Sequence, residues 1–285
     1  MAITNFIPEL WAAEMLELWV AQNVFPSLVN REYEGLATRG NTVKITGVVI
    51  PTVHDYAAAG RLTSPDAISD TGIDLVIDQE KSTDFYVDDI DRAQAAGSLT
   101  PFTDAAAYGM VADTDEFIAN MLVSGGQPLT TSVTDAPGAG TDGNLTADDA
   151  FNLLKDARKQ LNKNNVPGDN RVAAVNAEFE GLLLSAASKL TTFYQTGEEG
   201  TPGLRKATLG QLLGFQVVVT NHLPAFNAPQ FVAFNMRSAA FVSQIDQVEA
   251  LRATDKFADR VRALHVYGGK VIRPEGVVVF NPSGS

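Results

Sequence analysis

The sequence predicts an α+β fold, in which helices and strands are grouped in different parts of the chain. Three observations predict it. Residues 43–77 contain two strands with a long connection, residues 88–123 carry helical patterns, and helices and strands alternate after Thr146. No internal repeat is visible, and 285 residues are enough for one or two domains with a large core.

The composition restricts the classes of function. Apolar residues make up 45% of the chain, and 21 basic against 34 acidic residues give a net charge of −13. This charge argues against nucleic acid as a tightly bound partner, because phosphate binding needs a basic surface. The absence of cysteine excludes disulfides and thiolate chemistry. Because the N-terminus lacks a basic signal segment and no apolar run approaches ~18 residues, we expect a soluble, cytoplasmically made protein without a membrane partner.

Residues 7–21 read as a helix with an unusually apolar stripe. Ile7, Trp11, Met15 and Leu18 follow helical spacing, and Trp19 lies at the edge of the stripe. Such a helix packs either on its own core or on a neighbouring copy of the chain.

The next segment predicts a long β-hairpin. Val43, Ile45 and Val49 alternate with polar residues up to Pro51, and a second strand is expected at 72–77. An isolated two-stranded hairpin is marginally stable in water. Because the sequence offers no local helix to cover the hairpin, we expect an adjacent subunit to cover it.

Two helices are expected next. Asp88, Asp89 and Asp91 suit a helix N-terminus, and a break near 97–101 separates this short helix from a longer one. The longer helix is expected to place its apolar residues on one face and its acidic residues away from it. The apolar residues are Tyr108, Val111, Ile118, Met121 and Leu122, and the acidic residues are Asp113, Asp115 and Glu116.

The remaining chain predicts an alternating segment after a loop at 124–146, which is a candidate domain boundary. Thr146 and Asp149 have the spacing of a capping box, and the following helix carries a continuous apolar stripe at Ala150, Leu153, Leu154, Ala157 and Leu161. Further elements are expected in this order: a strand at 171–175, a helix at 178–190, a buried strand at 215–220, one or two strands in 231–250, and two closing strands joined near Gly268-Gly269.

Catalytic and cofactor motifs are not found in the sequence, so we predict no catalytic, cofactor-binding or metal-binding residues. The glycines at 138, 140 and 143 have the dinucleotide-motif spacing, but no buried strand precedes them. The histidines at 54, 222 and 265 fall in separate elements. One alternative of a different class stays open, a cytoplasmic acid–base or metal-dependent enzyme that uses Asp88, Asp91 or His222.

Five segments together resemble the major capsid proteins of tailed bacteriophages with the Hong Kong 97-type fold, and most closely the actinobacteriophage group. They are FIPELWAAEMLELW (6–19), VFPSLVNREYEG (24–35) followed by GNTVKI (40–45), FYVDDIDRAQ (85–94), LGFQVVVTNHLP (213–224) and RVRALHVYGGKVIRPEGVVV (260–279). Together, in this order, the segments span nearly the whole chain.

The resemblance implies four parts of the chain. Residues 1–32 would form an N-terminal arm, 33–88 an extended β-hairpin loop, 89–130 with 255–285 a peripheral domain with a long spine helix, and 131–254 an axial α/β domain. It implies self-assembly into pentamers and hexamers of an icosahedral phage head that encloses double-stranded DNA without binding it specifically. The expected subunit-interface residues are Trp11, Met15, Leu18, Trp19, Arg31, Tyr33, Glu34, Arg61 and Lys81.

The expected partners follow from the same resemblance. They are further copies of the chain, a portal protein, cement or decoration proteins and a scaffolding protein, which we expect to be separate because the arm begins almost at Met1. The expected location is the virion, after assembly in the host cytoplasm. An encapsulin-like compartment shell, which shares this fold, is the alternative within the same structural class.

Overall fold

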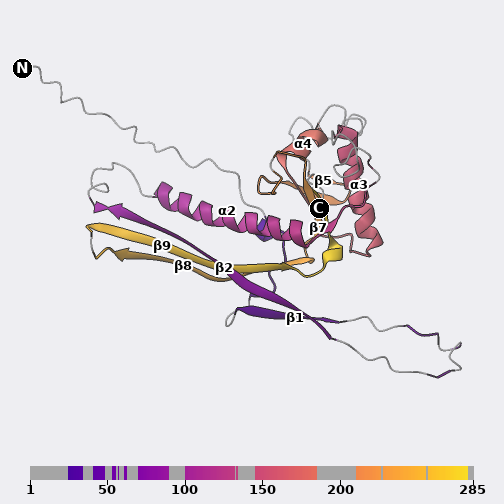
Figure 1. The fold of residues 1–285 in the computed structure, drawn as a ribbon, viewed down its shortest axis with the longest axis horizontal. Coiled ribbons are helices and arrows are strands. Elements are labelled where there is room, and N and C mark those ends of the chain that lie inside the picture. The colour runs from indigo at the N-terminus through magenta and orange to yellow at the C-terminus, as the bar shows by residue number, and fades with distance from the viewer. Residues whose placement is uncertain are drawn as a thin grey trace, which may run out of the picture.

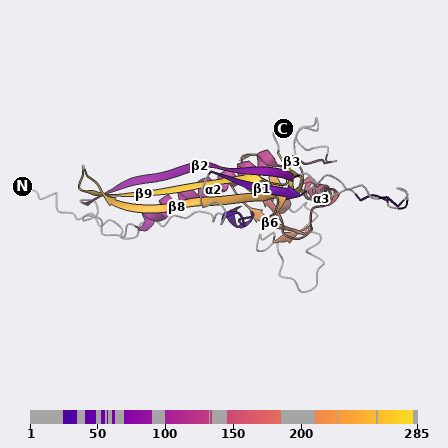
Figure 2. The same cartoon turned by 90° about the horizontal axis from the view of Figure 1, so that it is seen from below.

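The computed structural model shows an elongated molecule in which one long helix, α2, lies along a four-stranded sheet and a second sheet with two helices sits at one end (Figure 1). The structure describes residues 25–34, 41–48, 53–55, 57, 61–62, 70–89, 100–131, 133, 145–184, 210–225, 227–254 and 256–281. The view from below shows β2, β9 and β8 running side by side along the long sheet (Figure 2).

The helices and strands follow in this order: η1 (Phe25–Ser27), β1 (Thr42–Val48), β2 (Asp70–Asp88), α2 (Thr100–Gly125), β3 (Gln127–Pro128), α3 (Ala147–Lys163), β4 (Arg171–Val175), α4 (Ala177–Leu184), β5 (Gln211–Leu212), β6 (Phe215–Val219), β7 (Phe231–Asn235), β8 (Ala239–Arg252), β9 (Ala258–Val271), η3 (Pro274–Gly276) and β10 (Val277–Phe280). The α+β prediction is confirmed.

The long sheet has the order β1-β2-β9-β8, and all its neighbours are antiparallel. The pairing of β1 with β2 confirms the hairpin. The prediction for the second strand was too short, because β2 runs for 19 residues and pairs with β9 as far as Asp88. Asp88 therefore ends the strand, and Asp89 directly after it is helical. Asp91 lies outside the described residues.

The base of the hairpin is covered by its own chain, which corrects the expectation that an adjacent subunit must cover it. Val43, Ile45, Leu75 and Ile77 are buried in a cluster with residues of β8 and β9. The partners are Ala240, Val242 and Val266, with Tyr33 packed against them. Each buried aliphatic side chain of this size contributes about 1.5–3 kcal/mol. The hairpin therefore leaves the molecule from a fixed base.

The second sheet has the order β3-β10-β7-β4-β6-β5, with an apolar cluster on each face. One cluster contains α3 and α4, and the other contains α2 and η1. The strand predicted at 215–220 is present as β6 but is only half-buried, because its outer neighbour β5 has two residues. Val219 at its end is 39% exposed.

The long helix differs from the prediction in which side chains it buries. Ile118 and Leu122 are fully buried as expected, but Val111 is 44% exposed and Asp115 is fully buried. The reason is that α2 packs against two different partners along its length. Ile118 and Leu122 belong to the cluster with η1, whereas an earlier turn contacts the long sheet through Thr114.

The α3 prediction is confirmed in detail. Thr146 and Asp149 form a capping box, and the predicted apolar stripe is fully buried. The strand at 171–175 is confirmed as β4. The helix α4 covers Ala177–Leu184, and the rest of its predicted range lies outside the described residues.

Gly268 and Gly269 do not form the predicted turn between the last two strands. They lie inside β9, and the chain turns later at η3. A Cβ atom at Gly268 would lie 2.3 Å from the carbonyl oxygen of Val76. The glycine is therefore required for close packing of two strands and not for a turn.

Candidate assembly interface

The segment that follows the N-terminal 24 residues is fixed at the junction of α2 and β8. Phe25 is buried, and its backbone N–H donates to the buried carboxylate of Asp115 at 3.2 Å. The Asn30 N–H donates to the carbonyl of Ala239 at 3.0 Å, and the Phe241 N–H donates to the carbonyl of Asn30 at 3.0 Å. The expected interface residues Trp11, Met15, Leu18 and Trp19 precede this anchor and lie outside the described residues.

Arg31, Tyr33 and Glu34 follow the anchor, close to the base of the hairpin. The Arg31 guanidinium donates to the Glu34 carboxylate at 2.8 Å, and the Arg31 side chain is 50% exposed. The Tyr33 ring packs against the apolar cluster under the hairpin. These three predicted interface residues therefore lie together, with the charged pair facing solvent.

Lys81 connects β2 to the long helix. Its ammonium lies 3.2 Å from the carboxylate of Asp113 on α2, and the hydroxyl of Tyr267 on β9 donates to the same carboxylate. Burial and this hydrogen bond raise the pKa of the Tyr267 hydroxyl above its ordinary value. Lys81 therefore has a partner within its own chain, and 44% of its side chain stays exposed.

The described residues near the hairpin tip expose apolar side chains. Val53 is 94% exposed and Leu62 is 77% exposed. Arg61, a predicted interface residue, is exposed and adopts a left-handed backbone conformation with φ of 62°. Non-glycine residues rarely adopt this conformation. An apolar side chain and a cation therefore stand next to each other far from the core.

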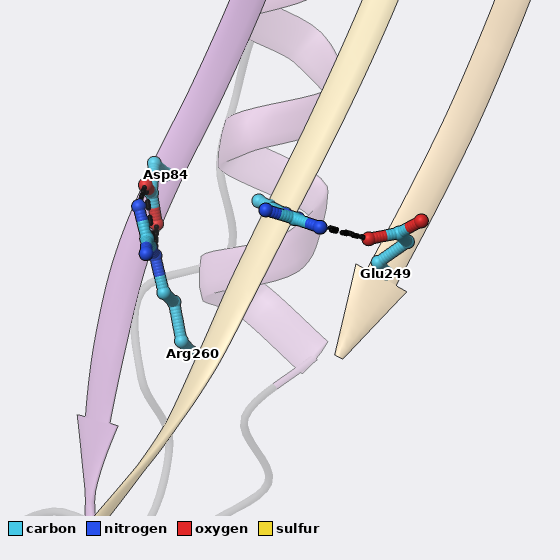
Figure 3. Close-up of polar contacts among 4 residues, drawn as sticks. Asp84, Glu249 and Arg260 are labelled. Carbon is cyan, nitrogen blue, oxygen red and sulfur yellow. Dashed lines mark hydrogen bonds and ion pairs between the residues drawn. The ribbon is translucent and has the colours of Figure 1, made fainter. Parts of the chain in front are cut away.

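Ion pairs connect neighbouring strands at the far end of the long sheet (Figure 3). Arg260 on β9 pairs with Asp84 on β2, and Arg262 pairs with Glu249 on β8 at 2.5 Å. The Arg260 hydrogen bond holds the pKa of the Asp84 carboxyl below its usual value. These pairs stabilise a part of the sheet that has few buried apolar residues.

Further contacts at the same end of the long sheet join the end of β8 and the residues after it to the end of β2. Arg252 donates to the carboxylates of Asp89 at 2.8 Å and Asp259 at 3.1 Å. The Tyr86 ring lies beneath the Lys256 ammonium, 5.3 Å from the ring centroid. Sequence reasoning missed both groups of contacts, although the acidic residues of 84–89 and the arginines of 252–262 were a signal for strand pairing.

Asp88 and His222, the two described residues of the alternative enzyme reading, are not brought together. Asp88 ends β2 in the long sheet, whereas His222 follows β6 in the second sheet, where its backbone N–H donates to the Thr220 hydroxyl. His265 bonds the hydroxyls of Ser243 at 3.0 Å and Thr114 at 3.5 Å, as expected for a partly buried imidazole. Within the described ranges, no three His, Asp or Glu side chains are grouped as metal ligands, and no helix is long and apolar enough to span a membrane.

The sequence profile of the phage capsid protein family matches residues 73–280 of this chain. The chain belongs to the phage capsid protein family. The matched range begins inside β2 and ends with β10, so it includes the spine helix α2, the whole second sheet and the long sheet except β1 and the start of β2.

Solved structures support this assignment. A chain from Mycobacterium phage Che8 is 58% identical, with a TM-score of 0.87 over 100% of both chains. The capsid structure of the cyanophage P-SCSP1u matches at 17% identity and a TM-score of 0.77, over 99% of this chain and 94% of that one. A chain from Mycobacterium phage Ogopogo matches at 13% identity and a TM-score of 0.60, over 96% of each. The last two show the fold alone. No curated protein matches the chain.

The capsid protein has a Hong Kong 97-type fold, as its resemblance predicted, and its place is the virion. Its role is structural, so the alternative reading of Asp88, Asp91 and His222 as enzyme residues is wrong. As a capsid protein it assembles with further copies of itself into a shell.

Proposed function

We propose that this capsid protein is the major coat protein of an icosahedral phage head and assembles into pentamers and hexamers around double-stranded DNA. The observation that supports the proposal is the hairpin. Its base is packed within the chain, while Val53 and Leu62 near its tip stand in water at 94% and 77% exposure. An exposed apolar side chain on a projecting element is covered when another molecule packs against it.

The geometry also favours a ring. The hairpin base is packed within its own chain, and we infer that its tip contacts a surface of a second copy that differs from the hairpin itself. Such a head-to-tail contact generates closed rings when the rotation between copies closes. Pentamers and hexamers are rings of this kind.

The interface residues and the parts of the chain belong to the same proposal. We assign Trp11, Met15, Leu18 and Trp19 to an arm of residues 1–32, and Arg31, Tyr33, Glu34, Arg61 and Lys81 to contacts around the extended loop of residues 33–88. Residues 89–130 with 255–285 would form the peripheral domain and residues 131–254 the axial domain.

The net charge of −13 supports an inner wall that encloses DNA without binding it tightly. We propose a separate scaffolding protein, a portal protein and cement proteins as further partners, with assembly in the host cytoplasm. Expressing the chain alone tests the scaffold, because closed uniform shells without any other phage protein would contradict the need for one.

Light scattering and electron microscopy test the main proposal. Native assemblies should be closed particles of tens of nanometres with five-fold vertices and double-stranded DNA inside. Small oligomers of fixed size would contradict a coat protein, and closed particles that hold other proteins instead of DNA would indicate a compartment shell.

A further inference from the structure

A groove of about 540 Å³ lies between the C-terminal half of α2 and the base of the hairpin. Phe117 and Met121 on α2 and Val76 on β2 form its apolar part. Pockets that bind small ligands have volumes of roughly 300–1,000 Å³. The groove therefore has room for a side chain from another molecule.

Alternate residues of β2 line this groove as far as a β-bulge. The register with β9 shifts between Ile77 and Gln79. Before the bulge, Asp74, Val76 and Asp78 line the groove, while Ile77 points into the apolar cluster under the hairpin. Successive side chains of a strand point to opposite faces, so residues two apart share a face. Strand alternation thus places two carboxylates in the groove beside α2.

The floor of the groove is open because Gly269 has no side chain. A Cβ atom at this position would lie 2.9 Å from the sulfur of Met121 and 3.2 Å from the carbonyl oxygen of Ala240. The glycine lets helix and sheet approach closely and still leaves Met121 accessible in the groove.

The polar part of the groove favours a cation. Within the described residues, Asp74 and Asp78 form no ion pair. The Asp78 carboxylate accepts a hydrogen bond from the Gln79 side-chain amide at 3.0 Å. Lys270 also lines the groove, and its ammonium donates to the backbone carbonyl of Asp74 at 3.0 Å. Two carboxylates against one lysine leave the lining with a negative charge.

The hairpin tip has the complementary composition. Leu62 is 77% exposed, and the neighbouring Arg61 is exposed without an ion pair to any described residue. The tip thus presents an apolar side chain beside a cation, and the groove presents an apolar floor beside carboxylates.

We propose that Leu62 of one copy packs on Phe117 and Met121 in the groove of the next copy, where the Arg61 guanidinium pairs with Asp74 and Asp78. This inference rests on the proposed function, because it places one contact of the capsomer ring. The tip and the groove are different surfaces of one chain, so the contact is head-to-tail and repeats around a ring.

Cysteine cross-linking tests the contact directly, because the natural chain contains no cysteine. The variant Leu62→Cys with Asn120→Cys, which lines the groove, is assembled into shells and oxidised. Covalent ladders ending at five and six chains on a non-reducing denaturing gel are expected. The matched control pairs Leu62→Cys with Lys159→Cys on α3, which should give no ladder. Closed shells of the first variant that yield only single chains would overturn the inference and leave the proposed function intact.

A charge exchange tests the ion pair. Arg61→Glu and Asp78→Arg should each remove most closed shells, and the chain that carries both changes should recover them. Lys159→Glu makes the same change in net charge as Arg61→Glu and should assemble normally. If Arg61→Glu and Asp78→Arg each assembled like the unmodified chain, the proposed pairing would be wrong.

Discussion

The hydroxyl of Tyr267 on β9 donates a 2.5 Å hydrogen bond to the carboxylate of Asp113 on α2. The same carboxylate lies 3.2 Å from the Lys81 ammonium on β2, so one group joins the helix to two strands. The Tyr267 ring is buried and packs edge-on against Phe117 at 5.2 Å. This contact fixes the spine helix on the long sheet.

We expect Tyr267→Phe to lower the free energy of unfolding by about 1–3 kcal/mol, because it removes a hydrogen bond to a charged group and keeps the buried ring. Urea unfolding of the unassembled subunit measures the change. Tyr86→Phe is the matched control, since its ring is 48% exposed and contacts Lys256 through the ring face. It should change stability by less than about 0.5 kcal/mol. Equal losses in the two variants would contradict the assigned role of the Asp113 contact.

The Asp84–Arg260 pair predicts a pH dependence. The pair lowers the pKa of Asp84 in the folded chain, while an unfolded aspartate has a pKa of about 3.9. Folding is therefore favoured by the ionised carboxylate above that pH, and the contribution is lost as the pH falls through the lower folded pKa. The melting temperature of Asp84→Asn should lie slightly below that of the unmodified chain at pH 7, and the difference should disappear in strong acid. A difference that stays constant down to pH 2.5 would exclude this pair as its cause.

The sequence predicts well where local chemistry decides the structure. The capping box at Thr146 and the stripe of α3 depend on residues within a few turns of each other, and both are present. The same holds for β4, whose four apolar residues after Arg171 are all buried as their run indicates.

The errors arise where distant segments decide the structure. Residues 78–88 show no alternation of apolar and polar side chains. They form a strand because β9 pairs with them, and Arg260 on β9 forms an ion pair with Asp84. Gly268-Gly269 resembles a turn in sequence, although the neighbouring backbone of β2 is what requires glycine at Gly268. The groove at Asp74 and Asp78 depends on the packing of β2 beside α2 and β9, which are distant from it in the sequence.

The long helix gives a prediction that distinguishes two of its five expected apolar positions. Ile118→Ala should cost about 2–5 kcal/mol, because the side chain is fully buried in the cluster with η1. Val111→Ala should have little effect or a small stabilising one, because Val111 is 44% exposed and alanine favours the helix. Thermal unfolding of both variants measures the difference. A similar loss at Val111 would mean that this position is covered in the subunit after all.

The close approach of β2 and β9 gives a prediction for two glycines. A Cβ atom at Gly268 would lie 2.3 Å from the carbonyl oxygen of Val76 and 2.7 Å from the Cα of Ile77, and backbone atoms in a paired strand have little room to move. We expect Gly268→Ala to cost about 1–3 kcal/mol or more, and to displace the hairpin base. Thermal unfolding measures the cost, and the yield of closed shells reports the displacement.

Gly72→Ala is the matched control in the same hairpin. Nothing lies within 4 Å of a Cβ atom at Gly72, and the residue is already in the extended strand β2. Alanine restricts the unfolded chain more than glycine does, so this variant should be neutral or gain about 0.4–1 kcal/mol. If Gly268→Ala were equally well tolerated and its shells closed normally, the strands would have to separate without cost at this point. That result would contradict a rigid hairpin base, which the proposed head-to-tail contact requires.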